Sequence, residues 1–199
     1  MPPMSFGGTY TLERVLGTVP VEADGSAYMK LPAQRSLFFV ALDEHGNSVQ
    51  RMMSFLTLMP GDTTGCVGCH EQRTQTPRNF SRSQLLALRR GPSKITPVEG
   101  IPEVFDYVRD IQPILDKHCV RCHNDERRDG RVALTGDRGP IYSHSYYVLT
   151  ALGQVTDGRD RLVSNLPPRA IGTSASPLMD KLDARHYEVQ LSPHERDMI

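Results

Sequence analysis

The chain has 199 residues, of which 38% are hydrophobic, enough for one hydrophobic core or two small ones. Its 23 Lys and Arg residues balance its 23 Asp and Glu residues, so no net charge favours nucleic acid or an anionic membrane as a partner. No apolar run approaches the roughly 18 residues of a membrane-spanning helix. The first residues show neither the basic nor the apolar region of a signal peptide.

Residues 10–60 predict a small antiparallel domain that resembles a β-sandwich. The run SLFFVAL at 36–42 is mostly apolar and predicts a buried strand. The next five residues, DEHGN at 43–47, have the composition of a turn, and residues 48–53 are then the hairpin partner. His45 lies in this turn, where we expect it to be solvated.

The sequence predicts a second domain, mainly helical and rich in loops, over residues 61–199. Its first motif is CVGCH, which contains Cys66, Cys69 and His70. The segment SRSQLLALRR at 81–90 has helical composition and ends at a Gly-Pro pair, which stops a helix.

A second motif, CVRCH, contains Cys119, Cys122 and His123. Apolar residues recur at helical spacing over 104–115 and predict a helix that leads directly into this motif. Near the end of the chain, a Ser-Pro pair followed by Glu195 has the pattern of a capping box and predicts the start of another helix.

The two Cys-x-x-Cys-His motifs use all four cysteines and predict two covalently bound c-type haems. The chemistry requires this spacing, because two thiols must reach the two vinyl groups on one edge of the porphyrin. The adjacent His then turns under the ring to ligate the iron. Random placement of the four Cys and seven His residues would give only about 0.003 such motifs.

Three other uses of the cysteines fit this pattern less well. The cysteine pairs of a zinc site usually lie about 15–20 residues apart, and the pairs that begin at Cys66 and Cys119 are much farther apart. A thioredoxin-like pair would lie at a strand–helix junction, which neither motif shows. Structural disulfides do not require the same five-residue pattern twice.

The adjacent histidines, His70 and His123, are the predicted proximal ligands of the two irons. A strong sixth ligand closes the iron and gives an electron carrier, whereas an open position allows small-molecule chemistry. For the second haem we expect His186, which follows a short capped helix and lies far enough along the chain to fold back over the distal face. The alternative is that His186 is a surface residue at a helix end.

The first haem leaves several alternatives open. Its sixth ligand is His144, a methionine from the β-half, or absent, with the position open or bound to water. The candidate methionines are Met52, Met53 and Met59.

Several charged or polar side chains flank the motifs. We expect His118 to cover a haem edge or propionate rather than to ligate its own iron, and the alternative is that it ligates the other haem. Arginines near the motifs either pair with propionates or form a solvated charged face. They are Arg73, Arg121, Arg127 and Arg128.

Four segments carry a family resemblance: PVEADGSAYMKLPAQRSLFFVALDEHGNSVQRM, MPGDTTGCVGCHE, DIQPILDKHCVRCHN and SPLMDKLDARHYEVQLSP. They resemble the C-terminal portion of the hydrazine synthase alpha subunit and related planctomycete multihaem cytochromes. The resemblance implies a dihaem unit that can follow a β-propeller in a longer protein. In that enzyme, a Tyr four positions after the first motif His binds the iron and frees that His for zinc. The matching residue here is Thr74, whose neutral hydroxyl is a poor iron ligand.

We therefore expect an α+β protein with two haems that transfers electrons, as a module of a larger redox enzyme or as a partner to one. The first alternative is a haem enzyme with an open first iron, acting on a small nitrogen or oxygen species. The second is an interaction module whose β-half docks the cytochrome onto another protein. Because haem is normally attached outside the bacterial inner membrane, we expect a fragment of a longer protein in the periplasm or an equivalent compartment.

Overall fold

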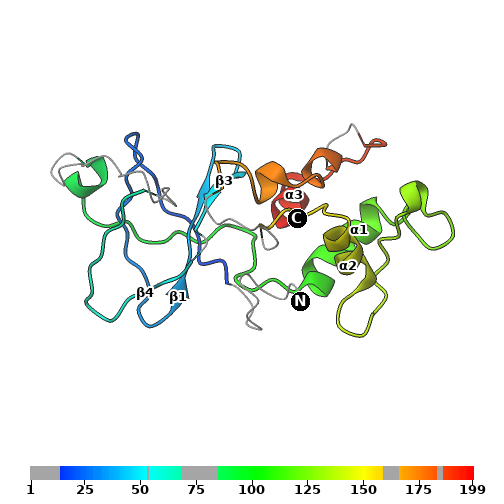
Figure 1. The fold of residues 1–199 in the computed structure, drawn as a ribbon, viewed down its shortest axis with the longest axis horizontal. Coiled ribbons are helices and arrows are strands. Elements are labelled where there is room, and N and C mark those ends of the chain that lie inside the picture. The colour runs from blue at the N-terminus through cyan, green and yellow to red at the C-terminus, as the bar shows by residue number, and fades with distance from the viewer. Residues whose placement is uncertain (1–13, 53, 69–84, 159–165, 183–185) are drawn as a thin grey trace.

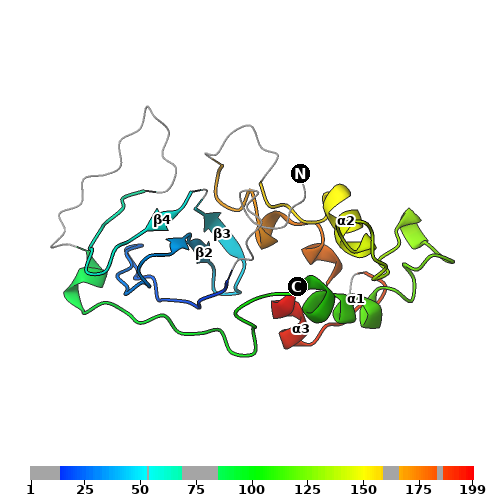
Figure 2. The same ribbon diagram turned by 90° about the horizontal axis from the view of Figure 1, so that it is seen from below.

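The computed structural model has an α+β fold in which short strands precede short helices, as the sequence predicts. In both views the strands lie at one end of the molecule, and helices α1 (Gln112–His118) and α2 (His144–Ala151) lie at the other (Figures 1 and 2). The structure describes residues 14–52, 54–68, 85–158, 166–182 and 186–199. No helix among these residues has the length and apolar composition needed to cross a membrane.

Four short strands form two separate antiparallel sheets of two strands each. Strand β1 (Ser36–Leu37) pairs with β4 (Leu56–Thr57), and β2 (Val40–Leu42) pairs with β3 (Ser48–Arg51). The small antiparallel sheets that the sequence predicts are therefore present.

The apolar run at 36–42 does not form the single buried strand predicted for it. Its two ends belong to different sheets, and Val40 and Leu42 are 39% and 49% exposed. Between β1 and β2, Phe38 packs edge to face on Phe55, with ring centroids 6.4 Å apart. The sequence of this short run does not indicate which of its residues pair with β3 and which pair with β4.

The turn predicted between β2 and β3 is confirmed. The carboxylate Oδ1 of Asp43 accepts hydrogen bonds from the backbone N–H groups of His45 (3.0 Å) and Asn47 (2.9 Å). Gly46 takes a positive φ of 78°, which glycine adopts without steric cost. The His45 side chain is 76% exposed, as expected for a solvated turn residue.

Residues 85–104 lie against the N-terminal part of the described chain. Backbone bridges join Thr18 to Thr96 and Met29 to Ser93. Gly17 allows the first of these, because its φ is +128° and a Cβ atom there would lie 2.2 Å from the Thr96 carbonyl oxygen. Within this stretch, Leu86–Arg89 forms a single 3-10 turn, and residues 81–84 of the predicted helix lie outside the described residues.

Helix α1 (Gln112–His118) leads directly into the second motif, as predicted. It follows a π-helical turn at Tyr107–Ile111, whose first N–H groups are capped by the Asp106 side chain. Pro113 lies in the first turn of α1, where its missing N–H leaves no helical hydrogen bond unmade.

Of the two remaining helices, the sequence predicted only the second. Helix α2 (His144–Ala151) was not predicted from the sequence. Helix α3 (Pro193–Met198) has the predicted capping box: Ser192 Oγ accepts from the Glu195 N–H at 3.2 Å, and Glu195 Oε2 accepts from the Ser192 N–H at 2.9 Å. Single 3-10 turns occur at Asp129–Arg131, Thr173–Ala175 and Met179–Lys181.

Residues 166–174 return to the β2–β3 hairpin and connect the two ends of the molecule. The Arg169 guanidinium lies 2.7 Å from the Asp43 carboxylate. The Ser48 hydroxyl donates to the Ile171 carbonyl at 3.0 Å, and the Ser48 N–H donates to the Thr173 hydroxyl at 2.8 Å. The chain that carries His186 therefore starts from a fixed point on the hairpin.

The core of the helical end is built on Leu115, Leu134 and Leu149, which are 1%, 6% and 6% exposed. Partly buried side chains pack against them: Tyr107, Ile111, Cys119, Val120, Val132, Val148 and Leu178. Because Cys119 belongs to this cluster, the second motif begins directly on the core.

Replacing Leu115 by Ala is expected to destabilise the protein by about 2–5 kcal/mol, because the change removes buried methyl groups and leaves a cavity. The matched control is Leu152→Ala at a position 52% exposed, where a change within about 0.5 kcal/mol is expected. Urea unfolding of both variants measures the difference. Equal losses in the two variants would mean that Leu115 does not centre a folded core.

Candidate functional site

The second motif forms one tight turn at the C-terminal end of α1. The Cys119 N–H donates to the Leu115 carbonyl at 2.8 Å. The N–H groups of Cys122 and His123 both donate to the Cys119 carbonyl, at 3.1 and 3.0 Å. The His123 carbonyl accepts from the Leu134 N–H at 2.7 Å. The backbone thus fixes the three predicted residues to one another and to the core.

The thiols of this motif are half-buried and unlinked. Cys119, Cys122 and Cys66 form no disulfide, and Cys66 is exposed. Burial raises the pKa of the Cys119 thiol to about 11, and the nearby Cys122 adds to the rise, against a lowering by the Arg121 guanidinium. Cys119 therefore carries no charge at neutral pH, which suits a sulfur packed against apolar side chains.

The structure places the His186 ring beside the ring of the motif histidine. The rings of His123 and His186 are parallel to within 7°, and their centroids are 6.0 Å apart. The Nδ1 atom of His123 is buried and has no hydrogen-bond partner among the described residues. Burial lowers the pKa of His186, and His123 and Lys181 lower it further, which favours the neutral imidazole.

This spacing matches that of two imidazoles on one metal ion. With metal–nitrogen bonds of about 2 Å on opposite sides of the ion, the ring centroids lie roughly 6 Å apart. Two aromatic rings in offset contact without a metal also have centroids about 4.5–7 Å apart. The pair fits both arrangements, and EPR of the oxidised protein distinguishes them.

A short loop after His186 holds this ring in place. Tyr187 and Glu188 both have positive φ, 49° and 60°, which is uncommon for residues other than glycine. The guanidinium of Arg121 donates to the Tyr187 carbonyl at 3.2 Å. Val189 is buried, and its N–H donates to the His186 carbonyl at 3.0 Å.

Helix α3 is tied to the last turn of α1 through one carboxylate. Oε1 of Glu195 accepts from Lys117 Nζ at 2.7 Å and lies 3.1 Å from Nε2 of His118. The side chains of His118 and Glu195 are both 15% exposed. His118 therefore bonds to α3 in this structure, and its predicted contact with a haem edge stays a prediction.

The pKa of Glu195 lies well below its usual value of 4.5, first because of Lys117, then because of the Ser192 N–H and His118. Its stabilising contribution is therefore present above pH 4.5 and is lost as the pH falls below it. We expect the stability of the wild-type protein to fall more steeply below that pH than the stability of Glu195→Gln. Urea midpoints across an acid pH series measure this, and parallel curves would contradict it.

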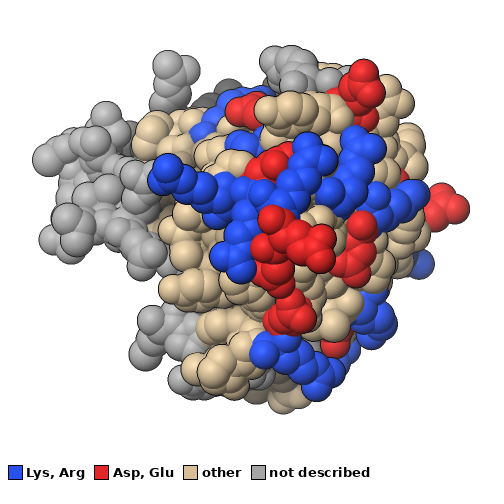
Figure 3. All heavy atoms as spheres, turned by 90° about the vertical axis from the view of Figure 1, so that its right-hand side faces the viewer, with Lys and Arg blue, Asp and Glu red and all other residues tan. Residues whose placement is uncertain are grey.

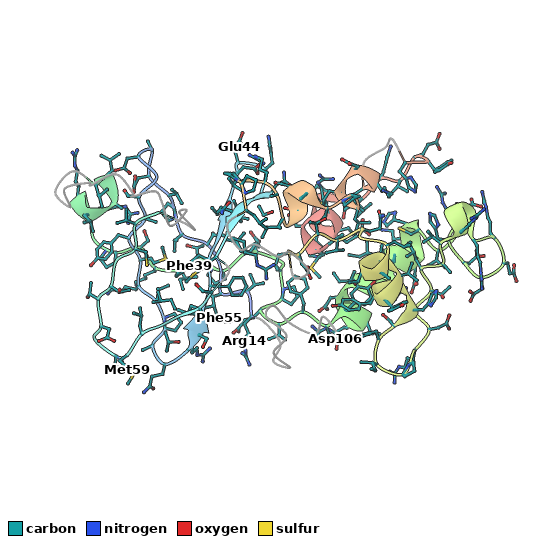
Figure 4. The ribbon with its side chains drawn as sticks, in the orientation of Figure 1. Arg14, Phe39, Glu44, Phe55, Met59 and Asp106 are labelled. Atoms are coloured by element: carbon teal, nitrogen blue, oxygen red, sulfur yellow. The ribbon has the colours of Figure 1, made fainter. Side chains whose placement is uncertain are left out.

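The first motif lies on an exposed segment. Residues 61–68, which include Cys66, are all exposed, and Val67 is 62% exposed. The segment comes after β4 in the chain and lies at the strand end of the molecule, away from α1 and α2 (Figures 1 and 2). Met59 lies at the outer edge of that end and Asp106 toward α1 (Figure 4). The other predicted residues of this site, Cys69, His70, Arg73, Thr74 and Met53, lie outside the described residues.

His144 is the first residue of α2 and is exposed. Because α2 and the segment before the first motif lie at opposite ends of the molecule, the structure does not bring His144 to that motif (Figures 1 and 2). His144 instead lines a cavity of about 560 Å³, together with Tyr142, Tyr147 and Arg138. The cavity was not foreseen, because its residues meet only through the loop before α2. The prediction that His144 ligates the first iron gains no support.

The arginines near the second motif mostly pair with acidic side chains of the same loop. Arg127 lies 2.8 Å from Asp129, and Arg128 lies 3.0 Å from Asp125. At this end of the molecule, Lys and Arg side chains form a band beside a group of Asp and Glu side chains (Figure 3). The face therefore carries both signs of charge.

Within the part of the chain that the structure describes, no three side chains of His, Cys, Asp or Glu converge as a metal-ion site.

Comparison with known proteins shows sequence similarity to one enzyme subunit. A family model described as the hydrazine synthase alpha subunit middle domain matches residues 6–71. The hydrazine synthase subunit alpha of Kuenenia stuttgartiensis is 27% identical over 242 aligned residues, which cover 94% of this chain and 29% of that protein. The chain is a distant homologue of this subunit and spans less than a third of its length. No solved structure matches the chain.

Proposed function

We propose that this chain is a dihaem c-type cytochrome unit that transfers electrons within a protein related to the hydrazine synthase alpha subunit. The observation that carries the proposal is the pair of parallel imidazoles, His123 and His186, with centroids 6.0 Å apart beside two free thiols. The five-residue attachment pattern occurs twice in the sequence, and the structure describes one of the two in full.

In this proposal the residues at the second motif have two roles, attachment of the porphyrin and binding of the iron. Cys119 and Cys122 would bind the porphyrin edge through thioethers, and His123 and His186 would hold the iron. The bound haem supplies one-electron redox chemistry. The core around Leu115 packs against Cys119 and would limit the access of water to a porphyrin bound there. Iron held by both histidines would have no position for substrate, which is the state of an electron carrier.

The proposal for the first haem rests on the sequence. Cys66, Cys69 and His70 repeat the pattern of the second motif, and the sixth ligand stays open between His144, a methionine and no protein ligand. The exposed segment at 61–68 and the homology to a subunit named as a synthase favour a second candidate function. In that candidate the first iron is open and reacts with a small nitrogen or oxygen species.

Carbon monoxide separates the two candidates. Spectra of the anaerobically reduced protein are recorded with and without CO, because CO binds ferrous haem only where a coordination position is free or becomes free. A pair of closed haems predicts no rapid change at either one. Rapid CO binding at the first haem alone would support the enzyme candidate, and rapid binding at the second haem would overturn the proposed His186 ligation.

We also propose that the protein works outside the cytoplasm and in a larger assembly. Covalent attachment of c-type haem is expected there, and the homologous protein is by its name one subunit of an enzyme. Expression in bacteria with and without the cytochrome c maturation machinery tests the first part: only exported protein made with that machinery should be coloured after denaturation.

A further inference from the structure

The loop that carries His186 is held to the second motif at two points. Near its start, the Arg121 guanidinium donates to the Tyr187 carbonyl at 3.2 Å. At its far end, Glu195 meets Lys117 at 2.7 Å and His118 at 3.1 Å. All three partner residues belong to the short stretch that ends at His123, so both contacts join the two histidine-bearing segments directly.

Both carboxylate oxygens of Glu195 take part in the contact between α3 and α1. Oε1 faces Lys117 and His118, whereas Oε2 accepts from the Ser192 N–H at the start of α3. The carboxylate therefore fixes the start of α3 and the end of α1 relative to each other. Hydrogen bonds to an ionised group are stronger than those between neutral groups, and here the carboxylate is only 15% exposed.

Between the two contacts, the backbone takes a conformation that the sequence does not favour. Tyr187 and Glu188 adopt positive φ in succession, and neither residue is Gly, Asn or Asp. Tyr187 is 78% exposed, so its side chain gains little from burial. Such a turn persists only where its surroundings hold it, and the surroundings here are the contacts of Arg121 and Glu195 and the buried Val189.

We propose that Glu195 and Arg121 are positioning residues that hold the His186 ring at its distance from His123 and so keep the sixth ligand of the second haem in place. This inference rests on the proposed function. In the structure, Glu195 contacts Lys117, His118 and the Ser192 N–H, and Arg121 contacts the Tyr187 carbonyl. They act by keeping the 186–195 loop closed against α1, and a weakened contact lets His186 leave the iron more often.

The test is the rate of CO binding to the second haem of the reduced holoprotein, because CO enters only when His186 has left. We expect Glu195→Gln and Arg121→Gln each to raise this rate, on the order of tenfold for one lost charge-assisted hydrogen bond. Arg121→Lys keeps a donor for the Tyr187 carbonyl and is expected to restore a rate near that of the wild type. The matched control is Glu188→Gln, an exposed carboxylate in the same loop.

Hydrogen exchange of residues 186–192 in the same proteins gives a second measurement. Faster exchange in Glu195→Gln and Arg121→Gln than in Glu188→Gln supports the proposal. Unchanged CO rates and exchange in both variants, with slow CO binding in the wild type, would overturn the positioning role and leave the proposed function intact. Rapid CO binding at the second haem of the wild type would overturn both.

Discussion

The variant with Cys119→Ala and Cys122→Ala is expected to keep one covalently bound haem instead of two. Both thiols of the second motif are free of disulfides and lie on one turn beside the His123–His186 pair. Without the two sulfurs, haem held only by the imidazoles would leave the chain on denaturation. Intact mass of the denatured protein and its pyridine haemochrome spectrum both count the covalent haems.

The matched control is the variant with Cys66→Ala and Cys69→Ala, which is expected to lose the other haem. Each pair of substitutions should lower the mass by one haem in addition to the lost sulfur atoms. A mass that falls by the sulfur atoms alone in either variant would show that the motif concerned carries no haem.

Replacing His186 by Ala is expected to open the second iron. The ring centroids of His123 and His186 are 6.0 Å apart, and removing one ring leaves the iron with a single nitrogen ligand from the protein. One low-spin signal in the EPR spectrum of the oxidised protein should change to high spin, and the reduced protein should bind CO at that haem.

Two histidine variants serve as controls for this experiment. His194→Ala changes an exposed residue of α3, and His144→Ala changes the exposed first residue of α2. Both are expected to leave the second haem unchanged. An unaltered EPR spectrum in His186→Ala would mean that the two rings form an offset stack and that His186 does not bind iron.

Much of the local structure follows from the sequence because its causes are local. The Asp43–Asn47 turn forms through hydrogen bonds from one side chain to its neighbours, and the capping box of α3 joins residues three positions apart. The helix before the second motif follows from its apolar spacing. These predictions needed no knowledge of distant residues.

The missed elements depend on contacts between distant residues. Helix α2 is rich in aromatic and β-branched residues, which have low helix propensity, and its N-cap Ser143 makes no side-chain capping bond. It gains stability from burial: Leu149 packs in the core, and Ser145 bonds to Gln112 of α1 and to Tyr107. The apolar run at 36–42 likewise divides between two sheets because its partners lie far along the chain.

In the candidate site, too, the features with local causes were predicted and the contacts between distant residues were not. The attachment residues are defined by a five-residue pattern, and His186 could be proposed from its spacing and its place after a short helix. The sequence gives no sign of the contact between Glu195 and His118 or of that between Arg121 and Tyr187, because side chains of α1 and α3 meet only in the folded chain. The sequence around an exposed histidine such as His144 does not distinguish an iron ligand from a surface residue.

The central claim is that four sulfurs join two porphyrins to this chain, and its most direct test is the mass of the exported protein after unfolding and acid extraction. We predict a coloured polypeptide heavier than the bare sequence by two haems. A colourless chain with the mass of the bare sequence would contradict the account, and the parallel rings of His123 and His186 would then need another explanation.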